Sequence, residues 1–107
     1  MNERIQNWFD HLTRKYYESG YGGSEITFTL LDGKKYYKIV YTQKWESNGQ
    51  YRHQVVHAFV DKTTGDVYKP ASFRSPAKIA RFNILNDASY NTMINNCDWA
   101  GSYLYIR

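Results

Sequence analysis

Hydrophobic residues at the start of the chain recur with the spacing of an amphipathic helix. Between about Asn2 and Ser19 the apolar positions follow one another at intervals of three and four: Ile5, Trp8, Phe9, Leu12 and Tyr16. This spacing places them on one face of an α-helix, where they can pack against a core. The glycine-rich residues 19–24 interrupt the pattern, so we expect a helix followed by a connector.

Residues 25–69 change to the alternating pattern of β-strands. The alternating segments are Glu25–Leu31, Lys34–Trp45 and Tyr51–Asp61, with a short one that begins at Val67. Turn signals at Asp32-Gly33, Asn48-Gly49 and Thr63–Asp66 separate them. The pattern predicts an antiparallel β-meander.

The third alternating segment has apolar residues on both faces. Strict alternation puts Val56, Ala58 and Val60 on one face, and His53, Val55, His57 and Phe59 on the other. We therefore expect it to be the central strand of the sheet, covered on both sides.

The rest of the chain is less periodic. Ser75-Pro76 is typical of a helix start and predicts a short helix from about Pro76 to Phe82, within a basic loop over residues 70–86. Residues 86–96 are rich in Asn and Asp and are expected to form a loop, with one helical turn near Tyr90 to Ile94. Ser102–Arg107 alternates and is expected to be a closing strand.

These elements predict an α+β fold with one domain over residues 1–107. The N-terminal helix packs on an antiparallel β-meander of four to five strands, in two layers. A chain of 107 residues is long enough for one hydrophobic core.

Charge adds a preference for anionic partners. The chain has 14 Lys and Arg against 10 Asp and Glu, a formal net charge of +4. Between Lys62 and Asn86 the sequence places five basic residues but one acidic residue, Asp66. Aromatic residues make up 18% of the chain, which suits both sheets and binding surfaces. This balance favours an anionic ligand without specifying nucleic acid.

The candidate site follows from this basic segment. Its charges are Lys69, Arg74, Lys78 and Arg81, and hydroxyl donors stand beside them at Ser72 and Ser75. A helix N-terminus next to arginine and lysine is a ready anion site. From the sheet, His57, Tyr36 and Tyr68 complete the expected ligand-binding set. The alternative is a solvated basic loop with no ligand.

The sequence lacks the residue patterns of most familiar enzyme chemistries. Cys97 is the one cysteine, so an internal disulfide and a multi-thiolate zinc site are excluded. His53 and His57 would lie about 13 Å apart along a strand, too far to share one metal. We expect no catalytic residue, metal or cofactor, although a small metal-independent nuclease using His57 stays open as an alternative.

The expected setting is intracellular. The sequence has no apolar run that could span a membrane and opens without a signal-peptide pattern. A single cysteine suits a reducing compartment. We therefore expect a cytoplasmic protein without a membrane partner.

One part of the chain resembles a known group of proteins. Thr64-Gly-Asp-Val-Tyr-Lys-Pro-Ala-Ser-Phe-Arg-Ser-Pro-Ala-Lys-Ile-Ala-Arg-Phe-Asn83 and Gly101-Ser-Tyr-Leu-Tyr105 resemble small tailed-bacteriophage proteins that carry Gly-x-Val-Tyr-Lys-x-Ala-Ser, then Pro-Ala-Lys-x-x-Arg and a terminal Tyr-Leu. Phe73 stands where members of that group often have Trp. The resemblance implies a phage gene expressed in the cytoplasm of a bacterial host, and no catalytic residue carries over from it.

Besides the nuclease, three non-enzymatic functions remain open on these grounds. The first is a non-enzymatic binding protein that holds a nucleotide-like anion, for example to sequester a defence signal. The second is a protein inhibitor of a host or defence enzyme, acting through a tyrosine-rich sheet face. The third is a nucleic-acid binder. Homo-oligomerisation through the terminal strand 102–107 also stays open.

Overall fold

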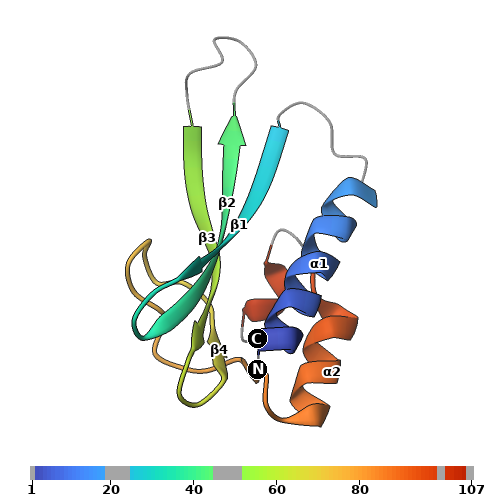
Figure 1. The fold of residues 1–107 in the computed structure, drawn as a ribbon, viewed down its shortest axis with the longest axis vertical. Coiled ribbons are helices and arrows are strands. Elements are labelled where there is room, and N and C mark those ends of the chain that lie inside the picture. The colour runs from blue at the N-terminus through green and yellow to red at the C-terminus, as the bar shows by residue number, and fades with distance from the viewer. Residues whose placement is uncertain (1, 19–24, 45–51, 99–100, 106–107) are drawn as a thin grey trace.

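The chain folds into two layers, with helices against one face of an antiparallel sheet (Figure 1). The structure, a computed structural model, describes residues 2–18, 25–44, 52–98 and 101–105. The helical elements are α1 (Asn2–Glu18), α2 (Asp87–Asn96) and a short 3₁₀ helix, η1 (Ser102–Leu104). The strands are β1 (Glu25–Asp32), β2 (Tyr36–Lys44), β3 (Arg52–Asp61), β4 (Asp66–Tyr68) and β5 (Phe82–Asn83).

Among the described residues the sheet has five strands in the order β1-β2-β3-β4-β5, each antiparallel to its neighbour. This confirms the predicted α+β class and the meander. The expected turn at Asn48-Gly49 lies outside the described residues, as does the glycine-rich connector.

The apolar stripe of α1 forms one side of the main core. Ile5, Trp8, Leu12 and Tyr16 are all buried. They pack in one cluster with Ile39 of β2 and with Ala58 and Val60 of β3. Burial of a side chain of this size stabilises the folded state by about 1.5–3 kcal/mol relative to exposure. The predicted helix and its buried face are therefore confirmed.

A β-bulge in β3 changes which residues face the helices. Ile39 lies opposite Ala58 and Val40 lies opposite Val56, so β3 has one more residue than β2 at this point, His57. The extra residue shifts the alternation by one. Val56 and Phe59 therefore pack in a second cluster with Val40, on the sheet face away from the helices. The predicted faces were wrong here, because alternation counted along the sequence assumes a ladder without bulges.

The bulge turns His57 toward the helices, where its side chain is 4% exposed. Its Nε2 lies 2.6 Å from the hydroxyl of Tyr103 in η1, and Trp8 Nε1 donates to the same hydroxyl at 3.0 Å. An indole can only donate, so the Tyr103 oxygen accepts from Trp8, and the same hydroxyl is hydrogen-bonded to His57. This network joins α1, β3 and the C-terminal turn.

The predicted helix over 76–82 is wrong, and the segment runs as an extended chain. Ala77 N donates to Lys69 O at 2.8 Å, and Arg81 N donates to Val67 O at 2.8 Å. These amides are therefore bonded to residues 67–69 and not to a helix, next to an isolated β-bridge between Pro70 and Pro76. Capping signals start a helix only when no better backbone partner is nearby.

This extended segment folds back over the outer face of the sheet. Lys38 of β2 donates from Nζ to the carbonyl oxygen of Phe73 at 2.8 Å, and its ammonium lies 4.3 Å from the centroid of the Phe73 ring. The basic stretch thus covers part of the sheet instead of projecting from it.

The Asn-rich segment forms α2 instead of the predicted loop. Asn86 caps it, because its side chain accepts from Ser89 N at 2.9 Å. Met93 of α2 and Cys97, which directly follows the helix, are both buried in the main core. α2 also contacts α1, since Arg4 pairs with Asp87 at 2.5 Å and Asn7 Nδ2 donates to Tyr90 Oη at 2.6 Å. Tertiary burial outweighs the low helix propensity of Asn.

The C-terminal segment does not form the expected closing strand. Ser102–Leu104 is one 3₁₀ turn, introduced by Gly101 at φ 88°. Leu104 and Tyr103 both pack in the core from this single turn. The alternating pattern of residues 102–105 therefore does not reflect pairing in a sheet. No helix among the described residues is long and apolar enough to cross a membrane.

Replacing Tyr103 with Phe should lower the free energy of unfolding by about 1–3 kcal/mol, because Trp8 Nε1 and His57 Nε2 each lose a buried hydrogen-bond partner. Urea unfolding followed by tryptophan fluorescence measures this change. Tyr105→Phe is the matched control, since Tyr105 is 60% exposed, and we expect it to change stability by less than about 0.5 kcal/mol. Equal effects of the two variants would contradict the proposed role of the network.

Candidate functional site

A small cavity brings together two of the residues that the sequence proposed for a site. Lys69 and His57 both line it, and its volume is about 180 Å³. Its other lining residues come from β2, β3 and the C-terminal turn: Tyr41, Val55, Val56, Pro70, Gly101, Leu104 and Tyr105. The charge of Lys69 and the rings of the tyrosines give it a mixed polar and aromatic wall.

The cavity forms where the segment that follows β4 separates from the neighbouring strand β3. β4 pairs with β3 only through Tyr68 opposite Phe59 and Val67 opposite Val60. Beyond Tyr68 the chain turns into the Pro70 bridge and leaves the edge of β3. The bulge at His57 places that ring at the inner end of the gap, and Gly101 closes it. A Cβ added at Gly101 would lie 3.7 Å from the His57 ring.

A second hollow, of about 220 Å³, shares three lining residues with the first. Both are lined by Val55, Val56 and Pro70, and the second continues to Ala71, Ser72, Phe73 and Gln54. Its lining is largely apolar, and Phe73 is 44% exposed at its rim. A polar compartment thus lies beside an apolar one.

The Lys69 ammonium is positioned by an aromatic ring. It lies 4.8 Å from the centroid of the Tyr105 ring, within the range of a cation–π contact. Burial, followed by the nearby Tyr105 hydroxyl, raises the pKa of Tyr41 above its ordinary value. The cavity therefore combines a lysine side chain with phenol rings, and ammonium and phenol groups are hydrogen-bond donors that suit an anion.

Asp98 fixes the turn that closes the cavity. Its carboxylate accepts from Gly101 N at 2.7 Å, from Ser102 N at 3.2 Å and from the Ser102 hydroxyl at 2.5 Å. Burial raises the pKa of Asp98, but these bonds outweigh it, and the pKa lies below its ordinary value. The ionised carboxylate is therefore the form that stabilises this turn.

Arg81 acts as a brace for the same turn. Its Nε donates to Leu104 O at 2.7 Å, and its Nη1 donates to Ile79 O. These bonds direct the guanidinium to the protein backbone, and the side chain does not line the cavity. The structure thus gives Arg81 a structural contact where the sequence proposed a ligand contact.

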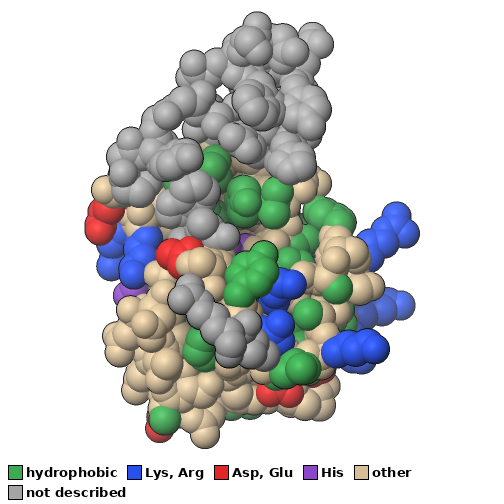
Figure 2. Space-filling model, turned by 180° about the vertical axis from the view of Figure 1, so that it is seen from behind, with side chains coloured by type: hydrophobic (Ala, Val, Ile, Leu, Met, Phe, Trp, Pro, Cys, Tyr) green, Lys and Arg blue, Asp and Glu red, His purple; other side chains and the backbone are tan. Residues whose placement is uncertain are grey.

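The other predicted site residues lie apart from the cavity. Ser72 lines the adjoining hollow, where its hydroxyl accepts from Arg74 N and Ser75 N and holds a turn. Arg74, Ser75 and Lys78 are exposed on this extended segment. Lys and Arg side chains project from the edge of the molecule on which the segment lies (Figure 2). The structure therefore separates a basic surface from the enclosed site.

Tyr36 and Tyr68 lie on the outer sheet face and take part in its packing. Tyr36 meets the ring of Phe59 edge-on, with centroids 5.6 Å apart. Both tyrosines pack against the cluster of Val40, Val56 and Phe59. Neither lines the cavity.

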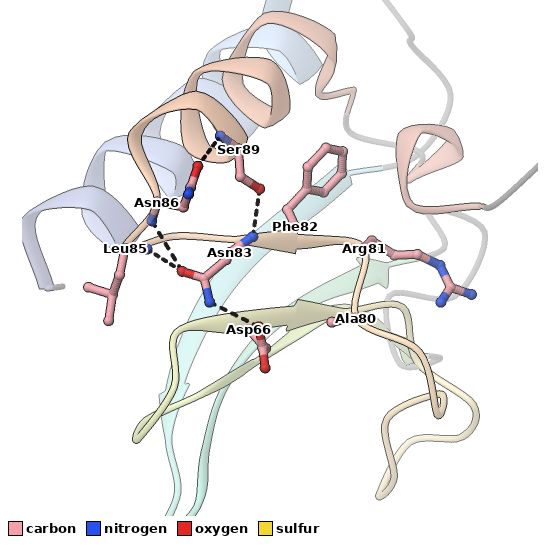
Figure 3. A pocket seen from close by; sticks show the side chains of 8 residues that line it. All are labelled: Asp66, Ala80, Arg81, Phe82, Asn83, Leu85, Asn86 and Ser89. Carbon is pink, nitrogen blue, oxygen red and sulfur yellow. Dashed lines mark hydrogen bonds between the residues drawn. The ribbon is translucent and has the colours of Figure 1, made fainter.

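Another hollow, of about 650 Å³, lies at β5 and the start of α2 (Figure 3). Its polar groups bond mainly to each other: Asn83 donates to Asp66 at 2.9 Å, and its Oδ1 accepts from the amides of Leu85 and Asn86. The hydroxyl of Ser89 accepts from Asn83 N at 2.8 Å. Arg81 points away from this group (Figure 3). We therefore interpret the hollow as the junction that joins β5 to α2.

Two other chemistries find little support. Burial raises the pKa of the Cys97 thiol, so little nucleophilic thiolate is present at neutral pH. Within the described part of the chain, no group of three or more His, Cys, Asp or Glu side chains is placed to hold a metal ion.

Sequence reasoning missed Tyr41, Gly101 and Tyr105 as lining residues. Tyr41 alternates with Ile39 along β2, and the cavity reaches this face of the sheet near the open edge of β3. Tyr105 was assigned to the closing strand 102–107, and Gly101 directly precedes that strand. The sequence signal that could have placed them is Asp98 with Gly101-Ser102, which is typical of a side-chain-stabilised turn.

The chain belongs to a protein family whose function is unknown. The family profile, described as Family of unknown function (DUF7717), matches residues 2–106. Neither the curated proteins nor the solved structures include a match to this chain.

Acid should destabilise the fold partly through Asp98. Because its pKa is lower in the folded state, its stabilising effect is complete above the unfolded pKa of about 4 and is lost as the pH falls through the folded pKa. Asp98→Asn should remove this part of the pH dependence of urea unfolding. A contribution from Asp61 should remain, because backbone bonds from Thr64 and Thr63 lower its pKa too.

Ser102→Ala is the matched control for this measurement. It keeps the carboxylate of Asp98 but removes one donor, so the folded-state pKa of Asp98 moves up toward its unfolded value, and the stability lost in acid should be smaller than in the unmodified protein. An acid profile that Asp98→Asn leaves unchanged would contradict the role assigned to this carboxylate.

Proposed function

We propose that this chain is a non-enzymatic binding protein that holds an anionic, nucleotide-like ligand in the cavity beside β3. The observation that carries the proposal is the pairing of two spaces with different chemistry. Lys69 and His57 line the first, and the apolar hollow that ends at Phe73 adjoins it through Val55, Val56 and Pro70. A phosphate suits the first space and a planar ring suits the second.

Lys69 is the residue assigned to the anionic group. It is the one Lys or Arg among the residues that line the cavity. A charge-assisted hydrogen bond contributes about 1.5–3 kcal/mol. The Tyr105 ring supports the Lys69 side chain, which lowers the entropy lost when a ligand binds.

Phe73 is the residue assigned to the ring of the ligand. Lys38 fixes Phe73 by two contacts: its Nζ donates a hydrogen bond to the Phe73 carbonyl oxygen, and the same ammonium lies over the Phe73 ring. A ring fixed in this way offers a stacking surface with little further loss of freedom.

No chemical step is assigned to this site. The Cys97 thiol has a raised pKa, and His57 Nε2 is engaged by Tyr103. Binding alone is enough for sequestration. The finer form of the proposal is a phage protein that sequesters a signalling nucleotide in a bacterial cytoplasm, and it rests on the resemblance of residues 64–83 and 101–105 to small phage proteins.

The test is a calorimetric titration with adenosine monophosphate, a cyclic dinucleotide and a short single-stranded oligonucleotide, each at low and high salt. We expect one of the nucleotides to bind with an affinity that survives high salt. Lys69→Met keeps the aliphatic stem without the charge and should weaken binding at least about tenfold. Lys78→Met, on the exposed segment, should change binding by less than about twofold.

Other outcomes contradict the cavity as the site. Binding of the oligonucleotide alone, lost at high salt and weakened equally by both variants, would favour a nucleic-acid surface on the basic segment. A titration without heat for any of the three probes, confirmed by an unchanged melting temperature, would overturn the proposal.

One observation favours the second candidate function, the inhibition of a protein partner. Ile79 is 62% exposed and Phe73 is 44% exposed, and Arg74 and Lys78 are exposed on the same segment. Apolar side chains next to arginine are typical of the centre of a protein interface. The contact surface would then be this segment and not the tyrosine-rich sheet face, which the segment partly covers. Ile79→Asp would abolish capture of such a partner and leave nucleotide binding unchanged.

A further inference from the structure

The outer edge of β1 has the features of a strand that pairs with another chain. β1 is the first strand of the sheet, and its register with β2 is regular over all of its residues from Glu25 to Asp32. Between Ile26 and Leu31 it contains no proline and no charged residue. Bulges, prolines and charges are the devices that protect edge strands from pairing, and this stretch has none of them.

The register shows which backbone groups face the edge. Gly33 N donates to Tyr36 O at 3.0 Å, which makes these two residues a hydrogen-bonded pair at the turn. Hydrogen-bonded and non-hydrogen-bonded pairs alternate along an antiparallel ladder. The N–H and C=O groups of Ile26, Phe28 and Leu30 therefore point away from β2, and no strand among the described residues pairs with them.

A hollow on α1 lies above the same edge. It has a volume of about 510 Å³ and is lined by Phe9, Asp10, Thr13, Arg14, Tyr17 and Glu18. The Phe9 ring packs edge-on against Phe28 of β1, with centroids 6.5 Å apart. The opposite flank of α1 contacts α2 through Arg4 and Asn7. The hollow is therefore on the side of α1 that faces the β1 edge, where Tyr17 is 72% exposed.

We propose that a second copy of this chain pairs with β1 through its own β1, in an antiparallel, twofold-symmetric dimer with one continuous sheet. A twofold contact requires a surface that complements itself. The flank of α1 meets this condition, because it carries Asp10 and Glu18 together with Arg14. Each arginine can then pair with an acid of the other copy, while the apolar part of each hollow covers the other.

The strand sequence fits this symmetry. With the twofold axis at Phe28, Thr27 of one copy lies opposite Thr29 of the other, and Ile26 lies opposite Leu30. The exposed face then pairs threonine with threonine, and the helix face pairs apolar residues, which are favourable cross-strand pairs. The Lys69 cavity lies next to β3, and β2 separates β3 from the β1 edge in the strand order. Dimerisation therefore leaves the site open, and the two proposals stand or fall separately.

Charged variants of the exposed threonines test the dimer. Thr27 and Thr29 are both exposed, so substitution should not disturb the core. Sedimentation velocity over a wide concentration range should give twice the chain mass of 12.7 kDa for the unmodified protein. The double variants Thr27→Lys/Thr29→Lys and Thr27→Glu/Thr29→Glu should each dimerise at least about tenfold more weakly, because like charges lie opposite each other. An equimolar mixture of the two should restore the dimer.

The mixture separates a lost interface from a lost fold, because a misfolded variant cannot be rescued by its partner. Thr92→Lys/Asn95→Lys adds the same charge on the exposed face of α2 and should leave the dimer unchanged. The proposal is overturned if the unmodified protein is monomeric at every concentration, if the Lys and Glu variants dimerise as it does, or if their mixture stays monomeric.

Discussion

The extra residue at His57 is the constraint on which both the helix layer and the cavity depend. A strand without a bulge would direct His57 to the outer face and Val56 to the helices. The bulge reverses both, so that His57 meets the Tyr103 hydroxyl, which also accepts from Trp8. Burial raises the pKa of Tyr103 well above its ordinary value, so the hydroxyl stays protonated and keeps its bond to His57. One phenol thereby fixes α1, β3 and the C-terminal turn relative to each other.

The same local irregularity shapes the candidate site. β4 separates from β3 just beyond Tyr68, and the C-terminal turn closes the resulting space under the control of Asp98 and Arg81. Arginine and aspartate thus support the wall of the cavity, and Lys69 supplies its positive charge. This division explains why only part of the basic segment belongs to the site. Arg81 donates from its Nε and Nη1 to backbone carbonyl oxygens, and these bonds hold its guanidinium outside the cavity.

Local patterns were sufficient for much of the fold. The stripe from Ile5 to Tyr16 predicted α1, and alternation predicted the first strands, because both patterns report burial on one face. The patterns failed where a distant partner decided the structure. Pro76 could not start a helix while the amides of Ala77 and Arg81 bonded to Lys69 and Val67. The Asn-rich segment became a helix because Met93 and Cys97 enter the core.

The sequence by itself determined the α+β class, the order of the main elements and the concentration of positive charge around residues 69–81, since composition and periodicity are local properties. Only the tertiary structure decided that Lys69 and His57 share a cavity with Tyr41 and Tyr105, and that Arg74 and Lys78 lie outside it. The physical reason is the bulge. A shift of one residue in a ladder reverses the faces of a strand, and no periodic pattern in the sequence records where that shift occurs.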